Sequence, residues 1–117
     1  MSEINDAVLQ RAVGAVCAGA VGDALGAGYE FTNPHPDDEI IMKGGGPFGW
    51  APGEWTDDTA MAIGVLDGIA DQECQIHEIG NNFLRWYASS PPDVGIQTSA
   101  VLSSAANGRE LVLVSRE

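Results

Sequence analysis

The sequence has little positive charge. Five of its 117 residues are Lys or Arg, whereas 17 are Asp or Glu, and the formal net charge is −12. A surface this acidic repels the phosphate backbone of nucleic acids and the anionic headgroups of membrane lipids. We therefore expect neither a nucleic acid nor a membrane among its partners.

Cysteine and long hydrophobic runs are also scarce. The two cysteines, Cys17 and Cys74, show no Cys-x-x-Cys spacing, which excludes a disulfide framework and a cysteine zinc site. Cys17 lies in an apolar run and is predicted to be a small core residue. That run, residues 12–22, is too short to span a bilayer, which needs about 20 apolar residues. The N-terminus is acidic where a signal peptide would be cationic, so a cytoplasmic location is predicted.

Hydrophobic periodicity predicts an all-α fold. Apolar residues recur at helical spacing in four segments, and Asp6 is the expected N-cap of the first. Residues 111–114 are rich in leucine and valine and are predicted to be strand-like, without a visible partner strand. The predicted helices are residues 6–24, 55–70, 76–88 and 98–106.

The first predicted helix carries a small residue at every fourth position. Gly14, Ala18, Gly22 and Gly26 would form one smooth stripe, along which another backbone can approach closely. Each glycine costs about 1 kcal/mol relative to alanine in a helix interior. A helix that tolerates this cost is expected to be central and tightly packed.

A long loop, residues 27–55, follows this helix. It contains a glycine triplet, residues 44–46, together with several prolines. A loop of this length in a compact domain is usually functional or disordered, and its interspersed aromatic residues argue against pure disorder. The triplet is not followed by Lys-Ser or Lys-Thr, so it is no P-loop.

The segment Thr56-Asp57-Asp58-Thr59 is the main candidate for chemistry. One interpretation is a helix start, because Thr and Asp cap helices and acidic residues favour the first turn. The other is a cation site, because two adjacent carboxylates flanked by hydroxyls are hard donors that suit Mg²⁺, Mn²⁺ or Ca²⁺. Spacing alone leaves both interpretations open.

The other titratable residues are weaker candidates. Asp23 stands at the end of the first helix. Glu30 follows between two aromatic residues, where a carboxylate is not freely solvated, although a surface glutamate is the alternative. His35 and His77 have no partners at metal-ligand spacing and are assigned to no metal.

Two blocks of the sequence resemble the ADP-ribosylglycohydrolases, a family that includes the hydrolases of ADP-ribosyl-arginine and dinitrogenase-reductase-activating glycohydrolase. They are Gly22-Asp-Ala-Leu-Gly26 and Trp55-Thr-Asp-Asp-Thr59, and the likeness extends over about residues 9–106. The resemblance implies an all-α fold in which helices pack as a compact orthogonal array. It also implies a single domain, residues 1–117, with a divergent tail over residues 109–117.

The resemblance further implies a binuclear magnesium or manganese centre and a reaction. The reaction is hydrolysis of the bond between the anomeric carbon of ADP-ribose and an acceptor, on an ADP-ribosylated protein or a small-molecule conjugate. Glycosidic cleavage develops oxocarbenium character, which cations and carboxylates can assist. The implied roles are metal ligation by Thr56, Asp57 and Asp58, catalysis by Glu30 and Asp58, and ribose binding by Asp93 and Gly95.

The sequence departs from the family pattern in one respect. Members of the family carry a second acidic cluster, Asp-x-Asp-Ser/Thr, whereas no Asp-x-Asp occurs in these 117 residues. We therefore expect a truncated member, its N-terminal portion, with about half of the metal ligands. Apolar helix faces left without partners would then be prone to self-association. The alternatives to a hydrolase are a non-catalytic remnant that associates through such faces, and an acidic cation-binding helical domain unrelated to ADP-ribose.

Overall fold

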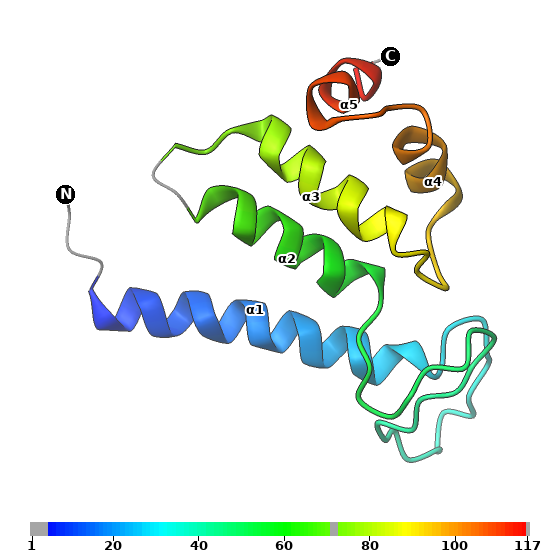
Figure 1. Ribbon diagram of the computed structural model, residues 1–117. Coiled ribbons are helices and arrows are strands. Elements are labelled where there is room, and N and C mark those ends of the chain that lie inside the picture. Colours follow the sequence, from blue (N-terminus) through cyan, green and yellow to red (C-terminus); the bar gives the residue numbers. More distant parts are fainter. Residues whose placement is uncertain (1–4, 71–72, 117) are drawn as a thin grey trace. The chain divides into compact units, whose positions relative to one another are not determined.

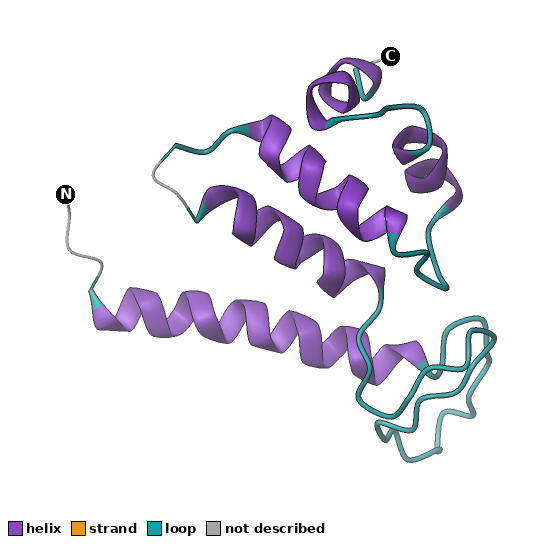
Figure 2. Cartoon of the chain, viewed as in Figure 1, coloured by secondary structure: helices purple, strands orange, loops and turns teal. Residues whose placement is uncertain are grey.

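The computed structural model describes residues 5–70 and 73–116, and these residues form helices joined by turns and loops. The described part of the chain contains no strand beyond one isolated bridge (Figure 2), so the all-α prediction is confirmed. The chain divides into two compact units, Met1–Thr59 and Ala60–Glu117. The helices, labelled in Figure 1, are α1 (Asp6–Ala27), α2 (Asp57–Ile69), α3 (Ile76–Ala88), α4 (Ile96–Leu102) and α5 (Gly108–Val114).

The N-cap of helix α1 is Asn5, one residue before the predicted cap, Asp6. The side chain of Asn5 accepts a hydrogen bond from the backbone N–H of Ala7 at 2.8 Å, and Asp6 is the first helical residue. The helix continues to Ala27, beyond the predicted end at Ala24. Asp23 therefore lies on the helix, close to its C-terminal end.

Within the first compact unit, the prediction that α1 is tightly packed is not met. Among the described residues of this unit, no atom outside the helix lies within 4 Å of the position that a Cβ would take on any of the four interior glycines of α1. Cys17 is exposed rather than part of a core, and Ala24 and Ala27 are the buried residues of α1. A smooth stripe allows close packing but does not supply the partner. Five large apolar residues of α1 are exposed: Val8, Leu9, Val13, Val16 and Val21.

Helix α1 is also the one helix among the described residues that is long and apolar enough to cross a membrane, judged by length and composition. The eleven-residue apolar run, residues 12–22, underestimates this length, because the helix extends beyond it on both sides. Core helices of soluble proteins and signal sequences pass the same test.

The loop between α1 and α2 is held by turns and close backbone contacts. Gly45 and Trp50 exchange two backbone hydrogen bonds, of 2.7 and 3.0 Å, which close a tight turn. Gly44 adopts a φ of +64°, which a glycine reaches without strain. A Cβ on Gly28 would collide with the carbonyl oxygen of Gly44. These glycines let the loop cross the end of α1 in direct contact.

The second compact unit is built around α3, whose bounds match the prediction. Asn82 donates its side-chain N–H to the carbonyl oxygen of Gly64 at 2.9 Å, which ties α3 to α2. Phe83 of α3 contacts the backbone of α2 at Gly64, and Ile79 contacts it at Gly68. Glycines at these positions let α3 approach α2 closely.

Helix α4 is shorter than predicted and starts earlier, at Ile96 rather than residue 98. It ends at Leu102 instead of residue 106. The hydroxyls of Ser103 and Ser104 donate to backbone carbonyl oxygens three residues back, at 3.2 and 2.7 Å. Such bonds compete with the continuing helix ladder, which explains the early end.

The strand predicted at residues 111–114 is wrong, because this segment is helical and belongs to α5. The side chain of Asn107 accepts hydrogen bonds from the N–H groups of Arg109 and Glu110, at 3.1 and 3.0 Å. Leu111 is buried, and Gly108 lies against Gly80 of α3. An N-cap and tertiary contact thus outweigh the preference of valine for strands.

Candidate functional site

The Asp23 carboxylate lies at the centre of the hydrogen-bond network that joins the end of α1 to the start of α2. Its Oδ2 accepts the backbone N–H groups of Thr56 and Thr59, at 2.9 and 3.1 Å. The Thr59 hydroxyl donates to the same oxygen at 2.6 Å, and the Thr56 hydroxyl donates to Oδ1 at 2.5 Å. Asp23 therefore caps α2 from 33 residues upstream.

This network changes the interpretation of the helix start. The first N–H groups of a helix have no partner within it, and an adjacent side chain usually accepts them. Here Asp23 accepts from Thr56 and Thr59, and both threonines are buried, each 7% exposed. The capping role proposed for the Thr56-Asp57 segment is largely taken by Asp23.

Opposing effects act on the pKa of Asp23. Burial alone would raise the pKa of this carboxyl group, but the hydrogen bonds from Thr56 and Thr59 together outweigh it and hold the pKa below its ordinary value. Asp23 is therefore ionised at neutral pH, as an acceptor of four hydrogen bonds requires.

Three predicted metal ligands lie together at the first turn of α2. The Thr56 hydroxyl oxygen is 3.2 Å from Asp57 Oδ1, which also accepts the backbone N–H of Asp58 at 3.1 Å. Asp57 is half-buried and Asp58 is exposed. Among residues 5–70 and 73–116, no three His, Cys, Asp or Glu side chains are grouped to hold a metal ion. The metal-ligand role of Thr56, Asp57 and Asp58 therefore stays a prediction.

Glu30 lies in the same compact unit, in the turn that follows α1, and is half-buried. Its neighbour Tyr29 is fixed to the loop, because its hydroxyl bonds both the N–H and the C=O of Ile41, each at 3.0 Å. Its other neighbour, Phe31, has a φ of +58°, which is unusual for a bulky residue, and is 76% exposed. The turn that carries Glu30 is therefore held in a specific backbone conformation.

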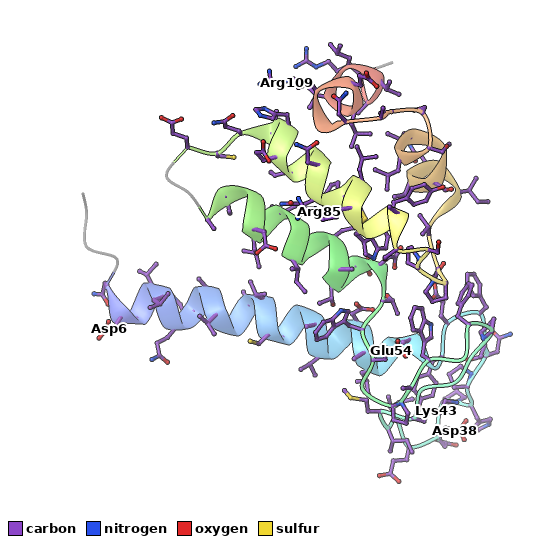
Figure 3. All side chains as sticks on the ribbon, viewed as in Figure 1. Asp6, Asp38, Lys43, Glu54, Arg85 and Arg109 are labelled. Atoms are coloured by element: carbon purple, nitrogen blue, oxygen red, sulfur yellow. The ribbon has the colours of Figure 1, made fainter. Side chains whose placement is uncertain are left out.

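The turn just before the threonine segment is fixed by Glu54, which is labelled in Figure 3. Its carboxylate accepts the backbone N–H of Ala51 at 2.7 Å, and its own N–H donates to Ala51 O at 3.0 Å. Of the two tryptophans nearby, Trp50 is buried beside Phe48 and anchors the loop, while Trp55 is half-exposed.

The residues predicted to bind ribose belong to the second compact unit. Asp93 is half-buried in the segment between α3 and α4, and Gly95 is exposed at the N-cap position of α4. This unit also contains an open cavity of about 530 Å³, whose lining includes no titratable residue. The cavity offers no acid–base chemistry, and the roles of Asp93 and Gly95 stay predictions.

The sequence does not predict the contact between the two residues that complete the network. Asp23 is a weak candidate for chemistry there, and Thr59 is predicted only as a hydroxyl of the Thr56-Asp57-Asp58-Thr59 segment. Both stand inside the two blocks that carry the family resemblance, Gly22–Gly26 and Trp55–Thr59. Their positions in those blocks were the available signal, but only the folded chain shows that they bond to each other.

Comparison with known proteins identifies the class. The family model for ADP-ribosylglycohydrolase matches residues 4–116, and the chain belongs to this family. It is 42% identical over 80 residues to the ADP-ribosylarginine hydrolase Tri1 of Pseudomonas putida (strain GB-1), an alignment that covers 68% of this chain and 22% of that protein.

Two further relatives are similar at the same level. The ADP-ribosylarginine hydrolase Tri1 of Serratia proteamaculans (strain 568) is 41% identical over 83 residues, covering 68% of this chain and 22% of that protein. The ADP-ribosyl-[dinitrogen reductase] glycohydrolase of Rhodospirillum rubrum is 37% identical over 94 residues, covering 75% of this chain and 32% of that protein. The chain thus spans between about a fifth and a third of the length of these relatives.

Proposed function

We propose that this chain carries part of the active site of a metal-dependent hydrolase that cleaves the glycosidic bond between ADP-ribose and an acceptor. The observation that carries the proposal is the cap that Asp23 provides for α2. Because Asp23 accepts the N–H groups of Thr56 and Thr59, the carboxylates of Asp57 and Asp58 are not needed to cap these two groups, although Asp57 Oδ1 also accepts the N–H of Asp58. Most of their oxygen atoms are therefore available for another role.

The oxygen atoms at this turn fit a divalent cation. Thr56 Oγ1 and Asp57 Oδ1 are 3.2 Å apart. Adjacent ligands of an octahedral ion with bonds of about 2.1 Å are about 3.0 Å apart, so the observed spacing suits Mg²⁺ or the slightly larger Mn²⁺. The donors are hydroxyl and carboxylate oxygens, which both ions prefer. Thr56, Asp57 and Asp58 would hold the metal.

In the proposed reaction each side chain has a defined task. When bound, the metal supplies charge stabilisation and lowers the pKa of a bound water. Glu30 and Asp58 carry the acid and base steps, since cleavage at an anomeric carbon needs a proton for the leaving group and a base for the water. Asp93 and Gly95 orient the ribose. We propose arginine as the acceptor, because two relatives are named ADP-ribosylarginine hydrolases.

These 117 residues lack part of the metal-ligand set of the family pattern. They contain no Asp-x-Asp sequence, which supplies the second acidic cluster in the family pattern. A missing carboxylate removes both a charge and a coordination position. We therefore propose that the chain by itself binds the metal weakly and hydrolyses slowly or not at all.

The test separates metal binding from turnover. Mn²⁺ binding to the chain is followed by electron paramagnetic resonance, and ADP-ribose release from an ADP-ribosyl-arginine peptide is followed by chromatography. The double variant Asp57→Ala/Asp58→Ala should lose Mn²⁺ binding, whereas Asp67→Ala, which removes an exposed carboxylate later in α2, should keep it. Equal Mn²⁺ affinity in both variants would contradict the proposed metal site.

A second candidate function is helix-mediated association without catalysis. The exposed apolar residues of α1 favour it, because a monomer rarely leaves such a surface uncovered. This function predicts a concentration-dependent oligomer and no release of ADP-ribose. Analytical ultracentrifugation distinguishes it from the hydrolase, and a monomer at high protein concentration would exclude it.

A further inference from the structure

We propose that Asp23 is a positioning residue for the metal site. It accepts the hydrogen bond of the Thr56 hydroxyl, and this orients a lone pair of Thr56 Oγ1 toward Asp57 Oδ1. The inference rests on the proposed function, because it gives that lone pair to a divalent cation. It assigns Asp23 a task beyond capping α2.

The first step concerns the location of one proton. A threonine hydroxyl has a single proton and two lone pairs. Thr56 Oγ1 is 2.5 Å from Asp23 Oδ1 and 3.2 Å from Asp57 Oδ1, and both atoms are carboxylate oxygens. A charge-assisted O–H···O⁻ bond is typically about 2.5–2.7 Å long. The short distance therefore places the proton on the line to Asp23.

The second step concerns what remains between Thr56 and Asp57. With its proton directed to Asp23, Thr56 Oγ1 faces Asp57 Oδ1 through a lone pair. Two oxygen atoms 3.2 Å apart with no proton between them repel each other. A cation that binds both relieves this repulsion, and the separation is close to the cis edge of an octahedral oxygen site, about 3.0 Å.

The third step explains why an aspartate is needed rather than an asparagine. Oδ2 of Asp23 accepts three hydrogen bonds from Thr56 N, Thr59 N and Thr59 Oγ1, while Oδ1 accepts the Thr56 hydroxyl alone. In Asp23→Asn, the amide oxygen keeps the three bonds and the NH₂ group takes the position of Oδ1. That group donates into Thr56 Oγ1, so the hydroxyl proton turns toward Asp57. The cap survives, but the lone pair is no longer available.

The experiment measures Mn²⁺ affinity in the full 117-residue chain by electron paramagnetic resonance, with far-UV circular dichroism confirming that each variant is folded. Asp23→Asn should weaken Mn²⁺ binding tenfold or more. The control is Thr59→Val, which removes the other hydroxyl bond to Asp23 and leaves Thr56 untouched. It should stay within twofold of the wild-type affinity.

A double-mutant cycle separates positioning from a general effect of charge or fold. Once Thr56→Val has removed the hydroxyl, adding Asp23→Asn should weaken Mn²⁺ binding no further. The same tenfold loss in the Thr56→Val background would overturn the inference, because Asp23 would then act through its charge. Unchanged affinity in Asp23→Asn alone would also overturn it while leaving the proposed metal site intact. A wild-type chain that binds no Mn²⁺ would refute both.

Discussion

Oδ2 of Asp23 accepts the backbone N–H of Thr59 at 3.1 Å, although the two residues are 36 positions apart in the sequence. The bond joins the last turns of α1 to the first turn of α2 within the first compact unit. A local N-cap could have served the helix equally well. The use of a distant aspartate ties the geometry of the candidate metal ligands to the end of α1.

The first prediction concerns pH. The pKa of Asp23 lies below its ordinary value of 3.8 in the folded chain, so the unfolded state takes up this proton more readily. Its stabilising effect is therefore complete above pH 3.8 and is lost as the pH falls through the folded-state pKa. In urea unfolding with a chelator present, the stability difference between wild type and Asp23→Ala should be constant from pH 7 to 5, at about 1–2 kcal/mol. It should shrink below pH 4; a difference that grows there would contradict the assignment.

The second prediction compares two glycines. Gly28→Ala should destabilise the chain by about 1–3 kcal/mol, because the new Cβ collides with the carbonyl oxygen of Gly44 and forces the loop to move. Gly14→Ala should stabilise it by up to about 1 kcal/mol, since open space surrounds that position and alanine favours the helix. Thermal unfolding of the two variants measures both effects. Equal shifts in the same direction would show that the contact with Gly44 is not formed.

The third prediction tests the helix that replaces the predicted strand. Asn107→Ala should lower the stability by about 1 kcal/mol, because two N–H groups of α5 lose their acceptor. Arg109→Ala is the control, since Arg109 is exposed and contributes only its backbone N–H to the cap. Chemical denaturation gives both values. Indistinguishable midpoints for the two variants would argue that residues 108–114 are not capped as described.

The fourth prediction concerns association. Val13→Gln/Val16→Gln removes two exposed apolar side chains from α1 and should shift the chain toward monomer. Ile96→Gln is a suitable control, because Ile96 is 93% exposed but stands on α4, away from that helix in the sequence. Sedimentation velocity over a range of concentrations provides the measurement. If the α4 variant disperses the oligomer and the α1 variant does not, the contact lies elsewhere.

Periodicity predicted the helices whose apolar pattern is strong. The bounds of α3 follow from its regular apolar spacing and the prolines that come after it, and α2 begins where the threonine and aspartates predicted a helix start. The failures lie where local preference and tertiary contact disagree. Val112 and Val114 favour a strand, yet the cap from Asn107 and the burial of Leu111 make the segment helical.

The sequence predicts which residues make up the candidate site, but not which of them hydrogen-bond to each other. Adjacency in sequence is enough to bring Thr56, Asp57 and Asp58 together, so their proximity was never in doubt. The role of Asp23 was not accessible, because a contact over 33 residues depends on how the intervening loop folds. That loop in turn depends on backbone contacts between Gly28 and Gly44, which leave no periodic signal.

The distant cap has a consequence for the order of folding. The loop of residues 28–56 must close before Asp23 can reach Thr56 and Thr59. Closure of a loop this long costs chain entropy, and this cost precedes the stabilisation by the hydrogen bonds. The first turn of α2 is therefore expected to form late, after the rest of its helix. In hydrogen exchange, the amide of Thr59 should open together with the loop rather than with the helix it belongs to, and it would serve as a natural reporter of loop closure.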